Sequence, residues 1–304
     1  MMGLQYFSFV DLWSPYLLTL MLAIIVLYTF VVGPWRERFA DSGPVGFGRQ
    51  ASFIAGVALL YLVQGGPLSL MGHLMFTFHM SDMAVSYFIV PPMLLYGVPP
   101  WLWRSVFSHK AWRPFRFLMN PLFGLFAFNL LFSFYHMPNN HDWIMTHYRV
   151  HALYYLALFL TSMISWWHVT SPVPEWSRLT NLRKLGFIFL NGLLLTPACV
   201  LIIFASTPLF GVYNDPQVWV KAMGYCVSGD PSALLSKFEG GPAFFSLLSP
   251  LDDQQLGGII MKLLQEGVNI IALFTVFMQW YKRERAQDED PTFDHAASGR
   301  LNNV

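Results

Sequence analysis

The chain has 304 residues, of which 55% are hydrophobic and only 12% are charged. A soluble globular domain carries about 25% charged residues, so this composition excludes an ordinary soluble fold and indicates a polytopic, all-α membrane protein. The formal net charge of +1 argues against a nucleic-acid partner, and two cysteines are too few for a disulfide framework or a cysteine-based zinc site.

Seven apolar segments predict a bundle of seven transmembrane helices, because about 20 mostly apolar residues cross the hydrocarbon layer of a lipid bilayer. The segment between the last two helices is expected to be an external cap with short helices around 216–225 and 231–238. The polar tail, 286–304, is expected to be disordered. The predicted spans cover residues 15–32, 51–65, 72–96, 117–137, 147–168, 185–205 and 256–281, and the external segment covers 207–255.

The positions of the basic residues predict the orientation of the bundle. Of the 18 lysines and arginines, 14 fall in the segments that follow the first, third, fifth and seventh spans. Basic loops stay in the cytoplasm, so the N-terminus is expected outside the cell and the C-terminus inside. Two charged residues lie within the seventh span, Lys262 and Glu266, and their i, i+4 spacing allows an ion pair. Lys262 lies about two turns from the outer end of its helix, which argues against a retinal attachment site near mid-membrane.

Histidines gather in the predicted outer half of the bundle. Six of the nine map there, and His147 and His151 are one helical turn apart. On the third span His79, Asp82 and Met83 share one stripe. On the fourth span Asn129, Ser133 and His136 share another. Polar seams in lipid are expected to face each other inside the bundle. The six outer histidines are His73, His79, His136, His141, His147 and His151.

This set of side chains predicts a copper site near the outer surface. Imidazole is the commonest transition-metal ligand, and thioether sulfur selects Cu(I). A carboxylate such as that of Asp82 can ligate the ion or orient an imidazole. The competing interpretation is structural, because histidine and methionine at helix ends often serve packing or the membrane interface; His73 and His141 are expected to do so. The predicted metal site comprises His79, His147, His151, His136, Met83 and Asp82.

Four stretches, at the start of the chain and in the third, fifth and seventh spans, together resemble the Bacillus-type CtaG family. They begin with FSFVDLWSP at Phe7–Pro15 and continue with FHMSDMA at Phe78–Ala84 and PPMLLYGVP at Pro91–Pro99. The pair HYRVH and SWWHVTSP follows in the fifth span, and DQQLGG opens the seventh at Asp253–Gly258. The sequence departs from the family pattern at Met83, where many relatives carry a second histidine, and at Lys262, where many carry tryptophan.

The resemblance implies an assembly factor for a caa(3)-type cytochrome c oxidase, and not an enzyme. It implies a multi-pass protein of the bacterial cell membrane that contacts oxidase subunits and handles copper. The outer loop and the Trp166–Trp167 region are expected to make those contacts. Three alternatives stay open: a b-type haem protein, a metal-free scaffold for oxidase subunits and, third, a transporter. The transporter ranks last because the inner half offers few polar groups besides His168 and Asn191.

Overall fold

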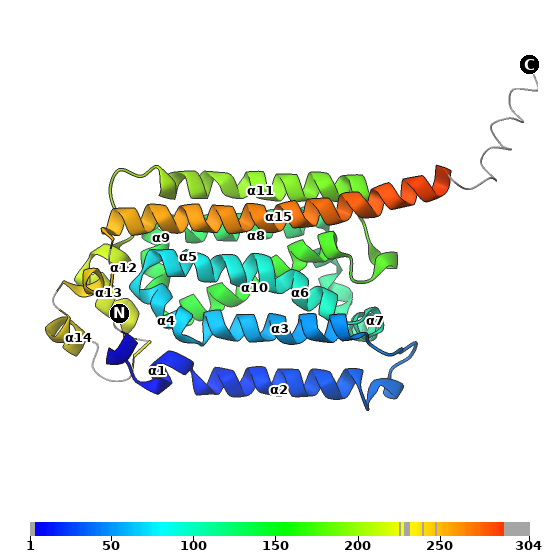
Figure 1. The fold of residues 1–304 in the computed structure, drawn as a ribbon, viewed down its shortest axis with the longest axis horizontal. Helices are drawn as coiled ribbons and strands as arrows, with labels where there is room; N and C mark the ends of the chain where they lie inside the picture. Colours follow the sequence, from blue (N-terminus) through cyan, green and yellow to red (C-terminus); the bar gives the residue numbers. More distant parts are fainter. Residues whose placement is uncertain (1–3, 225, 228–231, 239, 247, 289–304) are drawn as a thin grey trace, which may run out of the picture.

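The computed structural model describes residues 4–224, 226–227, 232–238, 240–246 and 248–288, and every element in these ranges is a helix. Five helical stretches are long and apolar enough to cross a membrane. They lie side by side along the long axis of the molecule (Figure 1). The five stretches are α1–α2 (Phe9–Trp13 and Pro15–Val32), α3–α4 (Phe47–Gln64 and Pro67–Leu74), α10 (Tyr148–Thr170), α11 (Asn181–Ile203) and α15 (Pro250–Asp288).

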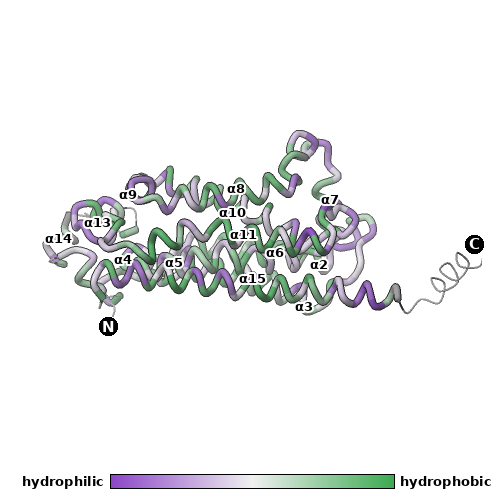
Figure 2. Tube along the Cα trace, turned by 90° about the horizontal axis from the view of Figure 1, so that it is seen from above, coloured by the Kyte–Doolittle hydropathy of each residue, from purple (hydrophilic) through white to green (hydrophobic). Residues whose placement is uncertain are grey.

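A sixth candidate span is the stretch made of α5 (Phe76–Ala84), the π-helical turn η3 (Val85–Ile89) and α6 (Val90–Gly97). The helix α7 (Pro100–Ser108) follows it at an angle of 91°. The described residues contain six candidate spans if this bent pair is one span, and five otherwise. The apolar helix α8 (Pro121–Tyr135) is shorter, at 15 residues. Seven crossings therefore stay a prediction. Figure 2 shows hydrophilic residues gathering towards the two ends of the molecule.

The break before the third predicted span falls later than the sequence suggests. Residues 72–74 belong to α4, and the chain is extended at Met75, with φ −138° and ψ 133°. The reason is local: Pro67 takes the first position of α4, where its missing N–H costs nothing, so the helix restarts directly after Gly65 and Gly66. The helix α5 thus begins at Phe76, close to His79.

The segment after α11 forms short helices at one end of the bundle. These are α12 (Gly211–Asn214), α13 (Pro216–Met223), α14 (Ser232–Lys237) and the 3₁₀ turn η6 (Gly241–Phe244). Two of them lie where the sequence predicts short helices. A small core joins α4 and α13 to the residues that directly follow α14 and η6. It is made of Leu70, Leu74, Trp219, Met223, Phe238 and Phe245. We call this end, which also carries α9 (Pro138–Met145), the histidine end.

The opposite end carries α7, the 3₁₀ segments η2 (Arg36–Arg38), η4 (Lys110–Met119) and η5 (Pro174–Trp176), and the end of α15 (Figure 1). We call it the basic end. The first described element, η1 (Leu4–Tyr6), lies at the histidine end, so the first and last described elements of the chain reach opposite ends of the bundle (Figure 1). Within the described residues the predicted tail is helical as far as Asp288; positions 289–304 lie outside them.

Candidate metal site at the histidine end

Helix α15 fixes the start of α5 and thereby the position of His79. The carboxylate of Asp253 accepts hydrogen bonds from the backbone N–H groups of Phe76 and Thr77, at 2.6 and 3.3 Å. These are N–H groups of the first turn of α5, which have no partner inside the helix. Gly257 lets the two helices touch, because a Cβ there would lie 3.1 Å from the carbonyl oxygen of Phe76.

The neighbouring residue Gln254 ties α15 to the chain that leaves α11. Its Oε1 accepts from the N–H of Leu209 at 2.7 Å, and its Nε2 donates to the carbonyl of Ile202 at 3.1 Å. Gln255 donates to the carbonyl of Ala205 at 3.0 Å. The DQQLGG stretch therefore connects α15 by hydrogen bonds to α5, to the end of α11 and to the chain that follows α11. Sequence reasoning used it only as a family signature.

Three histidines converge at the centre of the histidine end. The ring centre of His79 lies 5.3 Å from that of His141 and 6.4 Å from that of His136. Tyr135 packs against all three rings, at 5.1 to 5.7 Å. The three histidines come from α5, the C-terminal end of α8 and α9, and none is more than 3% exposed. We call His79, His136 and His141 the histidine trio.

The ring nitrogens of the trio have free hydrogen-bonding capacity. The Nδ1 of His136 pairs with the carbonyl of Phe132 at 2.8 Å. The Nε2 atoms of His79, His136 and His141 are buried and have no partner among the described residues. Burial lowers the pKa of His141, although Asp142 acts in the opposite direction. The lowered pKa favours the neutral ring, which has a free lone pair on one nitrogen. Neutral imidazole is the form that binds metals.

The spacing of the trio can be compared with what a shared ion needs. Imidazole nitrogen binds metals at about 2.0 to 2.1 Å, so two rings on one ion have centres at most about 6.5 Å apart. The 5.3 Å between His79 and His141 fits this limit, and the 6.4 Å to His136 reaches it. In the part of the chain that the structure describes, however, no group of three or more histidine, cysteine, aspartate or glutamate side chains is arranged to hold a metal ion. A three-ligand site therefore requires the rings to turn.

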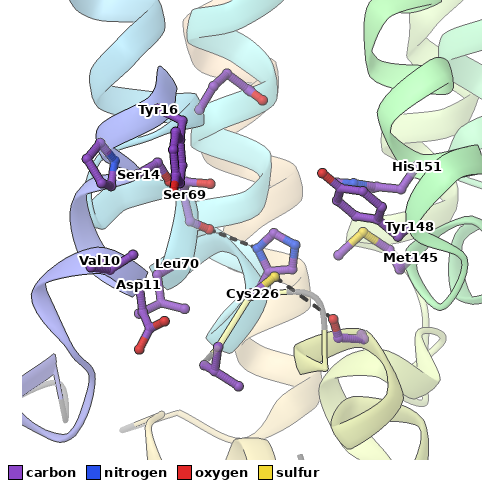
Figure 3. A pocket seen from close by; sticks show the side chains of 15 residues that line it. Val10, Asp11, Ser14, Tyr16, Ser69, Leu70, Met145, Tyr148, His151 and Cys226 are labelled. Carbon is purple, nitrogen blue, oxygen red and sulfur yellow. Dashed lines mark hydrogen bonds between the residues drawn. The ribbon is translucent and has the colours of Figure 1, made fainter. Parts of the chain in front are cut away.

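A second histidine pair lines a cavity of about 460 Å³ between α1, α4, α10 and α13 (Figure 3). The ring centres of His73 and His151 are 5.8 Å apart. The Nδ1 of His73 donates to the carbonyl of Ser69 at 2.9 Å, because a carbonyl oxygen can only accept. Figure 3 shows the sulfur atoms of Cys226 and Met145 in the same cavity.

The remaining predicted ligands lie apart from the trio. His147 is exposed at the start of α10, with its Nδ1 2.7 Å from the carbonyl of Trp143. Met83 is fully buried in the main core of the bundle. The carboxylate of Asp82 is 7% exposed and lies against Gly72, where a Cβ would be 2.8 Å from Oδ2. The structure thus brings His79 to His136 and His151 to His73, but it does not bring His147 to either.

Sequence reasoning missed His141, Tyr135 and Cys226 as members of these clusters. His141 was expected to serve the interface, yet it is 0% exposed. No spacing rule marks it, because α9 is a short helix outside the predicted spans. The Trp166–Trp167 pair, expected to contact a partner, is buried at 5% and 6% exposure in α10.

The comparisons with known proteins agree with the resemblance seen in the sequence. A sequence model of a family described as cytochrome c oxidase caa3 assembly factor (Caa3_CtaG) matches residues 26–283. This range includes all the histidines of the trio and of the cavity. Neither the search of curated proteins nor the search of solved structures found a match.

Proposed function

Because the chain belongs to the Caa3_CtaG family of cytochrome c oxidase caa3 assembly factors, we propose that it binds copper at its histidine end and passes it on during oxidase assembly. The role is non-catalytic, and copper is its cargo. The protein works as a multi-pass protein of the bacterial cell membrane, with the histidine end outside and the basic end in the cytoplasm. Its partners are oxidase subunits.

The observation that carries the copper proposal is the trio of buried, unpartnered Nε2 atoms. Leaving a buried polar atom without a partner costs about 1 to 3 kcal/mol. Three such atoms on neighbouring rings each carry this free-energy cost, and a metal ion bound to them would remove it. A soft donor lies close at hand, since Tyr135, which packs against all three rings, donates its hydroxyl to the sulfur of Met145 at 3.2 Å.

The cavity with His73 and His151 supplies an entry for the ion. Tyr155 links the cavity to the trio, since its ring centre lies 4.1 Å from that of His151 and 5.9 Å from that of Tyr135. Cys226 and Met145 offer sulfur donors in this cavity, which suits Cu(I).

The test is metal analysis of detergent-purified protein. We expect copper in the wild type and at least a tenfold loss of affinity in His79→Ala and His141→Ala, because each removes an unpartnered ring nitrogen. His147→Ala is the matched control; its ring is exposed and turned to Trp143, so copper content should not change. No copper in the parent protein, or equal copper in all variants, contradicts the proposal.

Two alternatives give different outcomes in the same experiments. A metal-free scaffold is favoured by the absence, in the described residues, of a ready three-ligand set; it predicts normal oxidase assembly in cells that carry the His79→Ala, His141→Ala double variant. A b-type haem protein predicts a Soret band in the purified protein. Copper handling predicts impaired assembly and a colourless protein.

A further inference from the structure

The basic end contains a second large cavity, of about 610 Å³, that copper handling does not use. It forms where α7 turns away from α6 by 91° and the chain runs on through η4. The last turn of α10 and the segment around η5 close its other side. Phe107, Trp112, Arg113, Trp167, Trp176 and Arg178 are among the residues that line it.

Aromatic rings form the walls of this cavity. The ring centre of Phe107 lies 4.9 Å from that of Trp112, 5.5 Å from that of Trp167 and 6.3 Å from that of Trp176. Phe115 and Phe117 continue the apolar surface outward, with 49% and 58% of their area exposed. Tryptophan and exposed apolar residues at the end of a helical bundle are typical of the membrane interface.

Two arginines in this cavity have no acidic partner within the described residues. The one carboxylate that lines it, Glu175, is taken by Arg104 from outside the lining. Arg113 and Arg178 make no ion pair or hydrogen bond with any residue that the structure describes. Deeper in, His168 lines the cavity at 4% exposure, and its buried Nε2 has no partner among the described side chains and backbone groups.

We propose that this cavity binds the headgroup of an anionic phospholipid. Guanidinium groups bind phosphate through charge-assisted, often bidentate hydrogen bonds, and Arg113 and Arg178 are both available for it. The exposed rings of Phe115 and Phe117 provide the apolar contact that acyl chains need and a soluble phosphate does not. Basic pockets between helices on the cytoplasmic side are suited to anionic lipids, because these lipids are abundant in the cytoplasmic leaflet.

The test uses full-length protein in detergent and native mass spectrometry with added phosphatidylglycerol or phosphatidylcholine. We expect phosphatidylglycerol to bind at least tenfold more tightly, and this preference to disappear in the Arg113→Gln, Arg178→Gln double variant. The control is Arg36→Gln, Arg38→Gln, which removes two basic residues from η2 at the same end and should keep the preference.

Several results overturn the proposal. Equal binding of the two lipids would show that the cavity does not recognise an anionic headgroup. An equal loss of the preference in the control variant would show that it arises from general surface charge. Displacement of the lipid by glycerol phosphate in solution assigns the site to a soluble phosphate. The single variants Arg113→Lys and Arg178→Lys guard against misfolding, since each keeps the charge and should retain part of the preference. Copper content is measured in parallel and should stay unchanged in all these variants, so a failure here is distinct from a failure of the copper proposal.

Discussion

Asp253 shows how a single side chain holds the histidine end together. Its carboxylate caps the first turn of α5 from a different helix and is only 3% exposed. We expect Asp253→Ala to lower the free energy of unfolding by about 1 to 3 kcal/mol, because the buried N–H of Phe76 and the half-buried N–H of Thr77 lose their acceptor. Thermal unfolding in detergent measures this. Asp252→Ala is the control, since that exposed carboxylate bonds only to Ser249; an equal loss in both variants contradicts the capping role.

Glu175 tests the charge balance of the aromatic cavity. The hydrogen bond from Arg104 lowers the pKa of Glu175, so the carboxylate is charged throughout the neutral range and its pairing is lost only as the pH falls through that lowered pKa. Both partners are on the surface, so Glu175→Gln should change stability little. It frees Arg104 and removes a negative charge from the cavity lining. We expect tighter phosphatidylglycerol binding at pH 7 by native mass spectrometry; weaker binding contradicts the assigned cavity.

At the scale of helices, α10 supplies hydrogen-bond donors to a backbone carbonyl that a proline leaves unpaired in the neighbouring span. Pro91 has no N–H, so the carbonyl of Tyr87, four residues earlier, loses its helical partner. The hydroxyl of Ser162 donates to that carbonyl, and the indole N–H of Trp166 donates to it at 3.2 Å. Inside a membrane an unpaired carbonyl is costly, which explains both the buried Ser162 and the π-helical turn η3 beside it.

This repair predicts coupled effects of two substitutions. Ser162→Ala and Trp166→Phe should each destabilise the protein modestly, because one donor remains. The double variant should lose more than the sum of the two, measured by thermal unfolding in a double-mutant cycle. Thr161→Ala is the control on the same helix, because its hydroxyl bonds only to α10 itself. Strict additivity would show that the two donors do not share the Tyr87 carbonyl.

The apolar helices and the gathering of histidines at one end follow from the sequence, because hydropathy and residue spacing act locally. Ring orientations do not. The expected clamp of His147 and His151 assumed helical backbone at both positions, whereas His147 has φ −127° and ψ 91° and turns its ring to Trp143. The contact of Asp253 with Phe76 joins residues 177 positions apart, and no local pattern encodes it. Cys226 enters the cavity from a turn after α13, where no periodicity applies.

For the whole molecule, the distribution of basic residues predicts which end faces the cytoplasm. A fluorescent-protein fusion at the C-terminus should fold and fluoresce, whereas an alkaline phosphatase fusion at the same site should be inactive. The same pair of reporters placed after Thr207, in the predicted external segment, should give the reverse result. Matching signals at both sites would contradict seven crossings with the histidine end outside.

The cap that Asp253 places on α5 also constrains the order in which the protein matures. A ribosome releases the start of α5 long before it reaches α15, so early in synthesis the helix that carries His79 has two unsatisfied amides. These two N–H groups gain their acceptor only when α15 packs against α5. All the histidines of the trio are therefore synthesised well before Asp253, and the contact that fixes the start of α5 beside them can form only near the end of synthesis.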